Sequence, residues 1–304
     1  MSFPNKYEKK VLKNFINSRF SRMRISHEKI NRLYTMLWSV KSKYGIRYFT
    51  RPNTLKPSFM IPGFPKCGTT SLYYYLSTHP NIEGSQPKET KFFSYEYSKG
   101  MGYYSLHFPM PKKDLMTFDA TQTYLYNHFA MKRIKKELPE CKFIICLRNP
   151  VEQIISRYSY QKGNGREILP LEECLNQETD RAKQFHERHS SEYVNPWAAG
   201  MSYPYRYVAT YINHVKHALT LFERKQFLFI KSDDLFNNTQ KTVSKIFEFL
   251  NVPDCKIDPV IHNASKHVNI DDKLIKELQD YFRPYNKQLE DLLGMNFNWD
   301  DKIN

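Results

Sequence analysis

A run of nine residues from Gly63 to Ser71, GFPKCGTTS, gathers the chemical groups that bind phosphate. Lys66 supplies an ammonium, and Thr69, Thr70 and Ser71 supply three consecutive hydroxyl groups. The run follows a short apolar segment and precedes one of helical character, and backbone amides at a helix N-terminus attract anions. We therefore expect a strand, a phosphate-binding loop and a helix here.

This loop departs from the loop of nucleoside triphosphatases. In the Walker A pattern a lysine directly follows the second glycine, whereas this chain has Thr69 after Gly68. The lysine lies inside the loop instead, at Lys66, and no acidic Walker B strand is evident. A P-loop nucleotide kinase therefore remains as an alternative function for this chain.

A second candidate phosphate loop follows the apolar segment 142–147, KFIICL, which reads as a strand buried on both faces. Arg148 comes directly after it, Pro150 is suited to start a helix, and Ser156 lies eight residues after the arginine. A guanidinium makes permanently charged, bidentate contacts to phosphate. A surface salt bridge is the alternative role for Arg148.

Together the two loops resemble those of sulfotransferases that use 3′-phosphoadenosine-5′-phosphosulfate (PAPS). PKCGTT is similar to their 5′-phosphosulfate loop, and Arg148 and Ser156 stand where the family holds the 3′-phosphate. The resemblance implies PAPS as co-substrate, released as adenosine 3′,5′-bisphosphate, an in-line displacement at sulfur and no metal. It implies the following cofactor-binding residues: Lys66, Cys67, Gly68, Thr69, Thr70, Ser71, Arg148 and Ser156.

Further motifs resemble the branch of heparan-sulfate glucosaminyl sulfotransferases and their bacterial relatives. They are KETKFF at 88–93, GMGYY at 100–104 and the C-terminal segment 279–299. In that branch the glutamate of the first motif is the general base, which implies Glu89, with Lys66 stabilising the charge on the leaving oxygen. A solvated loop glutamate is the alternative for Glu89, and a histidine base, with His107 nearest in the sequence, is its competitor.

Two positions differ from that branch. Residues 119–122, DATQ, replace the usual Glu-Lys-[Thr/Ser]-Pro, so that lysine is missing. The Lys-Gly-Arg loop is reduced to residues 265–267, in which Lys266 is still expected to contact PAPS. Because positive side chains are lost, we expect a hydroxyl or amine of a small polar metabolite, such as a natural product, as acceptor. A glycan or glycolipid is the alternative.

Tyrosine-rich segments are candidates for the acceptor pocket, although such residues are equally suited to a core. They are residues 73–75, 103–104 and 203–207. Aromatic faces suit a sugar ring or a cationic guanidinium compound.

The remaining pattern alternates strands and helices. Strands are expected over 58–62, 142–147 and 226–230, and helices over 71–78, 203–222, 239–250 and 271–293, the last with a bend at Pro284. This order predicts an α/β, P-loop-like sulfotransferase fold with a central parallel sheet flanked by helices on both faces. We expect a sulfotransferase domain over 57–304 after a basic helical extension over 1–56.

Composition limits the setting. The 304 residues include 22 Tyr and 21 Phe, which argues against disorder, and the formal net charge of +15 favours anionic partners. No fingerprint of a nucleic-acid-binding module is evident. Five cysteines without CxxC spacing, no secretory signal and no long apolar run lead us to expect a cytoplasmic protein. The extension 1–56 is expected to pack on the domain, a membrane-surface helix or an arm over an anionic substrate being the alternatives.

Overall fold

The computed structural model describes residues 55–109, 111–190, 203–258 and 268–299. Their centre is a sheet of five parallel strands in the order β2-β3-β1-β4-β5. The strands are β1 (Phe59–Met60), β2 (Ile82–Gly84), β3 (Met116–Asp119), β4 (Lys142–Leu147) and β5 (Phe227–Lys231). The expected α/β fold with a parallel sheet is confirmed.

Helices cover both faces of this sheet. The larger ones are α4 (Thr69–Leu76), α7 (His128–Glu137), α8 (Pro150–Gly163), α10 (Glu178–Ser190), α12 (Tyr211–Leu221), α14 (Thr239–Leu250) and α15 (Asp272–Leu293). The shorter ones are η1 (Phe92–Glu96), η2 (Tyr97–Lys99), α5 (Gly100–Ser105), α6 (Thr123–Tyr126), α9 (Leu171–Asn176), α11 (Tyr205–Ala209), η3 (Arg224–Gln226) and α13 (Ser232–Asn237).

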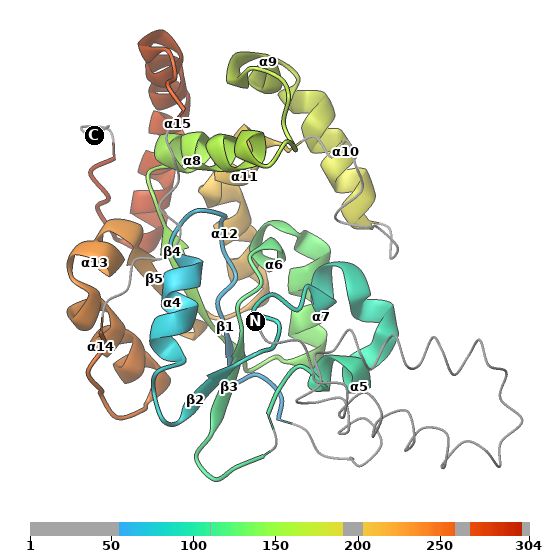
Figure 1. Cartoon of the computed structure of the whole chain (residues 1–304), viewed down its shortest axis with the longest axis vertical. Coiled ribbons are helices and arrows are strands. Elements are labelled where there is room, and N and C mark those ends of the chain that lie inside the picture. Colours follow the sequence, from blue (N-terminus) through green and yellow to red (C-terminus); the bar gives the residue numbers. More distant parts are fainter. Residues whose placement is uncertain (1–54, 110, 191–202, 259–267, 300–304) are drawn as a thin grey trace, which may run out of the picture.

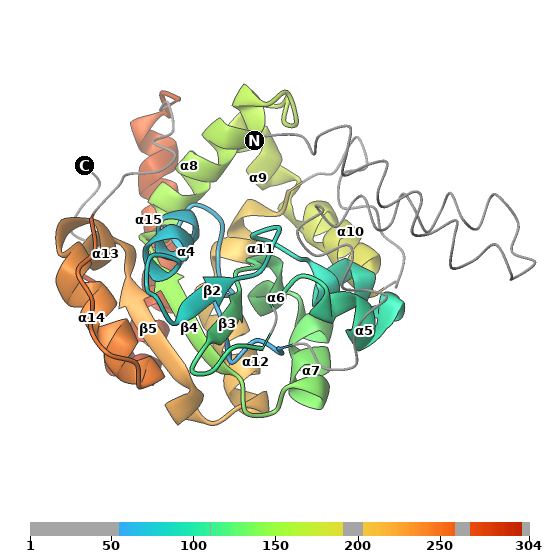
Figure 2. The ribbon, with the colours of Figure 1, turned by 60° about the horizontal axis from the view of Figure 1, so that its bottom comes forward.

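The handedness of the crossovers decides which face each helix covers. The connection from β1 to β2 runs one way along the sheet, whereas those from β3 to β4 and from β4 to β5 run the other way. Right-handed crossovers therefore place α4 on one face, and α7 and α12 on the opposite face. Figures 1 and 2 show this division, with α13 and α14 beside α4 and with α8 above the end of β4.

The core is aromatic, as the composition suggested. Phe59 of β1 stacks on Phe118 of β3 with ring centres 4.9 Å apart, and Phe143 of β4 stacks on Phe227 of β5 at the same distance. All strand residues from Phe143 to Leu147 are fully buried. Aromatic pairs stacked across neighbouring strands stabilise the sheet that carries the site.

The expected elements are found with shifts at their ends. The strand over 142–147 and the helix over 239–250 have the expected bounds, and the helix over 271–293 begins one residue later. The single helix expected over 203–222 is wrong, because the chain forms α11 and α12 with a break at Thr210, whose ψ is 69°. The expected helices in 1–56 lie outside the described residues.

Candidate active site

The expected phosphate loop lies between β1 and α4. Gly68 caps α4 in the left-handed region with φ 92°, and Lys66 has φ 69°. A Cβ atom at Gly68 would lie 3.1 Å from Leu235 and 3.2 Å from Phe236, so both the backbone conformation and the close approach require glycine. This turn points the loop amides and the first turn of α4 at one space, which is what an anion site needs.

The hydroxyls of the loop are held by neighbours. Thr69 and Ser71 are 2% and 1% exposed, whereas Thr70 is half-buried. Gln122 donates from Nε2 to the Thr69 hydroxyl at 3.0 Å, and its carbonyl accepts from the Gly63 amide at 3.3 Å. Gln122 belongs to residues 119–122, which differ from the related glycan enzymes. In this chain these residues stabilise the loop through hydrogen bonds and not through a lysine. Ala120, which stands in place of their lysine, is fully buried.

Lys66 lies in a strongly positive environment. Burial lowers the pKa of its ammonium, and the guanidinium groups of Arg157 and Arg148 lower it further. Its Nζ lies 5.2 Å from the centre of the Tyr160 ring. An anion bound here would relieve this repulsion, and so the loop fits a phosphate or phosphosulfate group.

Arg148 connects the two expected phosphate loops. It donates from Nη1 to the carbonyl of Lys66 at 3.3 Å, and its Nε lies 2.9 Å from Oε2 of Glu152. The salt bridge considered as an alternative therefore exists beside the loop contact. Gln153 adds a second link by donating from Nε2 to the Pro65 carbonyl at 2.9 Å, and Ser156 lies buried on the same helix, α8. Because β1 and β4 are neighbours, both loops meet at the carboxyl edge of the sheet.

Glu89 lies in a segment that is anchored on both sides. Upstream, the Ser85 hydroxyl, which is fully buried, donates to the carbonyl of Lys88 at 3.0 Å. Downstream, the Thr90 hydroxyl donates to Asp119 at 2.6 Å. The carboxylate itself is 30% exposed and has Lys88 Nζ 3.6 Å away. A glutamate fixed in this way can keep one orientation towards a substrate.

Asp119, at the end of β3, is the fixed point of that segment. Its carboxylate is fully buried and accepts hydrogen bonds from Thr90, Tyr124, Tyr104 and Thr121 at 2.6, 2.9, 3.1 and 2.6 Å. Burial raises the pKa of this carboxyl, and the hydroxyl donors act in the opposite direction. Tyr104, expected as a pocket residue, is thus a core residue with its hydroxyl used for structure.

His107, the competing candidate base, lies in the core. It is 3% exposed, its Nδ1 lies 3.1 Å from the carbonyl of Tyr104, and its ring packs edge-on against Tyr103 at 5.0 Å. Burial lowers the pKa of its imidazole. This position favours Glu89 over His107 as the group that meets an acceptor.

Cys67 offers only its backbone to a ligand. Its thiol is fully buried, lies 3.8 Å from the Tyr211 hydroxyl, and burial raises its pKa to about 12. Lys266 lies outside the described residues.

The sequence analysis missed Arg157, which directly follows Ser156. Its guanidinium lies 4.5 Å above the ring of Tyr203 and 5.7 Å from that of Tyr160. Burial raises the pKa of the Tyr95 hydroxyl, and the charges of Glu89 and Arg157 both act on that hydroxyl. Arg157 and Glu89 therefore border the same space. A basic residue inside the Arg148–Tyr158 motif was the available signal.

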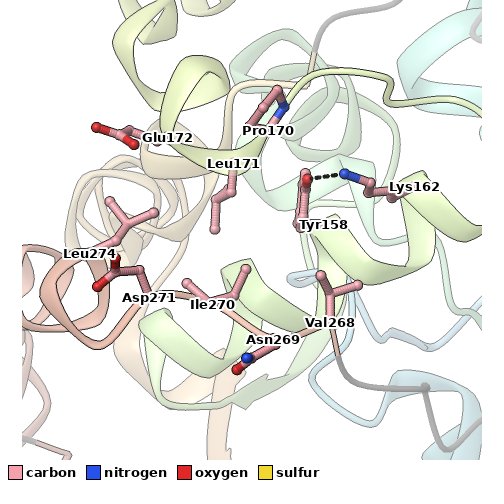
Figure 3. Close-up of a pocket in the computed structure, with 10 residues that line it drawn as sticks. All are labelled: Tyr158, Lys162, Pro170, Leu171, Glu172, Val268, Asn269, Ile270, Asp271 and Leu274. Carbon is pink, nitrogen blue, oxygen red and sulfur yellow. Dashed lines mark hydrogen bonds between the residues drawn. The ribbon is translucent and has the colours of Figure 1, made fainter.

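A separate pocket of about 240 Å³ lies between α8, α9 and α15 (Figure 3). Lys162 donates to the Tyr158 hydroxyl at 2.9 Å on its rim, and the floor includes Leu171 and Leu274. None of the predicted site residues lines it. The pocket is thus separate from the candidate active site, which consists of the two phosphate loops and the Glu89 segment.

In the described ranges of the chain, no helix is both long and apolar enough to span a bilayer. Within the same ranges, no group of three or more His, Cys, Asp or Glu side chains is placed to hold a metal ion.

Comparison with known proteins identifies the family. Residues 56–281 match the family described as the sulfotransferase domain. Human heparan sulfate glucosamine 3-O-sulfotransferase 6 is 27% identical over 271 residues, which cover 80% of this chain and 73% of the relative. Human bifunctional heparan sulfate N-deacetylase/N-sulfotransferase 2 is 29% identical over 206 residues, 64% of this chain but 22% of that protein.

A solved structure supports the same assignment. The sulfotransferase from Alicyclobacillus acidocaldarius is 27% identical, with a TM-score of 0.68, and the match covers 82% of this chain and all of that one. The two phosphate loops and the segment of Glu89 fall within the matched residues 56–281. The chain belongs to the sulfotransferase domain family and is a sulfotransferase.

Proposed function

We propose that this enzyme transfers a sulfuryl group from PAPS to a sugar hydroxyl or amine, with Glu89 as the general base. The observation that supports it most is the joining of the two loops: Arg148 contacts Lys66 directly, and Ser156 follows on α8. Two cationic side chains, Lys66 and Arg148, meet there, and burial and nearby guanidinium groups lower the pKa of the Lys66 ammonium. A doubly phosphorylated nucleotide supplies the negative charge that such a cluster lacks.

PAPS would supply the activated sulfuryl group. The bond from sulfur to the bridging oxygen breaks as the bond from sulfur to the acceptor forms. Glu89 takes the acceptor proton, and the ammonium of Lys66 stabilises the charge left on the phosphate oxygen. Hydroxyls and amides at the start of α4 hold the 5′-phosphate, and Arg148 and Ser156 hold the 3′-phosphate. Rate enhancement then comes mainly from positioning and from preorganised charge.

We favour a glycan acceptor over the small natural product expected from the sequence. The curated relatives named above are heparan sulfate enzymes. The charge of Glu89 acts on the ammonium groups of Lys88 and Lys91, and the charges of Glu89 and Arg157 both act on the Tyr95 hydroxyl. Two of the tyrosines that were expected to receive a cationic acceptor are in contact with the protein's own cations, since Arg157 lies over Tyr203 and Lys99 lies over Tyr103.

Calorimetric titration with adenosine 3′,5′-bisphosphate tests the nucleotide site. We expect Lys66→Ala and Arg148→Ala each to weaken binding about 10- to 100-fold, the range for lost charge-assisted hydrogen bonds. Lys225→Ala, which removes a cation with a 79% exposed side chain, controls for net charge and is expected to change nothing. Folded wild type that fails to bind the nucleotide, or binds ATP equally well, would contradict the proposal.

Radiolabelled PAPS tests the base and the acceptor. A heparosan oligosaccharide is offered beside a panel of small alcohols and amines. Glu89→Gln is expected to lower turnover about 10²- to 10⁴-fold while leaving nucleotide affinity unchanged, because it removes the proton acceptor alone. Glu140→Gln, at an exposed position, is the matched control. Label on a small molecule and none on the oligosaccharide would refute the glycan acceptor.

A further inference from the structure

Arg157 holds a charge that the described part of the protein does not neutralise. Its Nε is buried without a hydrogen-bond partner. Among the described residues, no carboxylate forms an ion pair with it. Its contacts are the ring faces of Tyr203, at 4.5 Å, and Tyr160, at 5.7 Å. Ring faces orient a guanidinium but leave its N–H groups without acceptors.

Other basic groups surround it. Burial lowers the pKa of the Lys66 and Lys91 ammonium groups, and Arg157 lowers both further. Arg166 adds to the effect at Lys91, where Glu89 opposes it. By contrast, the charge of the buried Arg181, whose Nε also has no partner, is neutralised by Glu167, to which its Nη1 donates at 2.7 Å. A partly buried guanidinium with an unpaired Nε–H is costly, and an anion from outside would offset that cost.

The nucleotide already has its own cations. Lys66 and Arg148 lie on the two phosphate loops and contact each other, whereas Arg157 points to Tyr203 and Tyr160. Its charge and that of Glu89 both act on the hydroxyls of Tyr95 and Tyr126. Because Arg157 also acts on Lys66 and shares the Tyr160 ring with it, Arg157 lies between the phosphate loop and the Glu89 segment, where an acceptor would meet the sulfuryl group.

We propose that Arg157, held between Tyr160 and Tyr203, binds an anionic group of the acceptor next to the hydroxyl or amine that faces Glu89. The inference rests on the proposed function and narrows its acceptor class to sugars that carry a carboxylate or a sulfate. Tyr160, which is 41% exposed, forms the outer wall of this subsite, and Tyr203 forms the buried wall. A guanidinium group binds the oxygens of a carboxylate or a sulfate through two charge-assisted hydrogen bonds, and therefore prefers these anions to a neutral hydroxyl.

Binding of three matched tetrasaccharides to the full chain, saturated with adenosine 3′,5′-bisphosphate, tests the subsite at constant ionic strength. One carries carboxylates, one carries N-sulfates with its carboxyls reduced, and one carries neither. We expect wild type to prefer one or both charged forms over the neutral form by about 10-fold or more. Arg157→Gln is expected to remove that preference, and Arg157→Lys is expected to restore part of it.

Arg283→Gln, at an exposed site on α15, controls for the loss of one positive charge. Nucleotide affinity is measured for every variant and is expected to stay within about twofold of wild type. Equal preferences in wild type and Arg157→Gln would overturn the inference, as would binding of none of the three sugars. A loss of nucleotide affinity in Arg157→Gln as large as that in Lys66→Ala would instead assign Arg157 to the nucleotide. Wild type that binds no nucleotide would refute the proposed function itself.

Discussion

Two polar regions lie at the carboxyl edge of the sheet, after the neighbouring strands β1 and β3, and they are built in opposite ways. Around Asp119, four hydroxyl groups donate to one fully buried carboxylate. Around Lys66, burial and the charges of Arg157 and Arg148 lower the pKa of the ammonium, and Arg157 has a buried Nε–H without an acceptor. We call the region around Asp119 saturated, because its carboxylate has four hydrogen-bond donors, and it holds the backbone in place. We call the region around Lys66 unsaturated, because the buried Nε–H of Arg157 has no acceptor among the described residues and a ligand could supply one.

The largest effect is expected at the saturated region. Asp119→Ala leaves four buried hydroxyls without their acceptor, and we expect the free energy of unfolding to fall by about 3–5 kcal/mol. Urea unfolding measures this loss. Asp119→Asn keeps the shape and one oxygen acceptor and is expected to lose about half as much. A loss below about 1 kcal/mol in Asp119→Ala would show that the network is not structural.

Gly68→Ala tests the phosphate loop of the unsaturated region, because Gly68 caps α4. At φ 92° a Cβ atom is strained, and it also meets Leu235 and Phe236, so we expect a loss of about 1–2 kcal/mol together with weaker nucleotide binding. Gly165 has φ 65° with nothing within 4 Å of a built Cβ, so Gly165→Ala isolates the backbone cost. Equal nucleotide affinity in both variants would mean that the loop tolerates the shift of its amides.

The sequence predicted a region where its residues are close together in the chain, and failed to predict one whose residues come from distant segments. The phosphate loops were predictable because lysine, glycine and hydroxyl groups lie within nine residues, and because KFIICL has the uniform apolar character of a buried strand. The Asp119 network was not, since Thr90, Tyr104 and Tyr124 reach it from three different segments. Strands β2 and β3, with three and four residues, are too short to show a period.

A cluster of histidines on α7 and α12 is expected to make the stability of the protein depend on pH. His128 of α7 stacks on His217 of α12 with ring centres 3.8 Å apart, and His214 lies 5.9 Å from His128. Burial lowers the pKa of His128 to about 4 and that of His214 to about 3, and the charges of His217, His186 and Lys132 lower the pKa of His128 further.

Because these folded-state pKa values lie below the unfolded value of about 6.5, the neutral rings contribute stability above pH 6.5 that is lost as the pH falls towards 4 and 3. We expect the urea midpoint of wild type to fall over this range. In His128→Phe, which keeps the stacked ring, the fall should be smaller. A pH profile identical to that of wild type would show that His128 does not control it.

The smallest effect is expected at Cys67, which lies inside the phosphate loop but faces away from the ligand. Its thiol is buried beside Tyr211, and its pKa is raised to about 12, so at neutral pH it is neither a nucleophile nor a charge. Cys67→Ala is expected to bind adenosine 3′,5′-bisphosphate within about twofold of wild type, because the amide that faces the ligand is kept. Calorimetry measures the affinity, and alkylation by iodoacetamide with and without nucleotide measures access. If nucleotide protected Cys67 from rapid alkylation, the thiol would face the ligand, and the side chain of Cys67 would belong to the unsaturated region around Lys66.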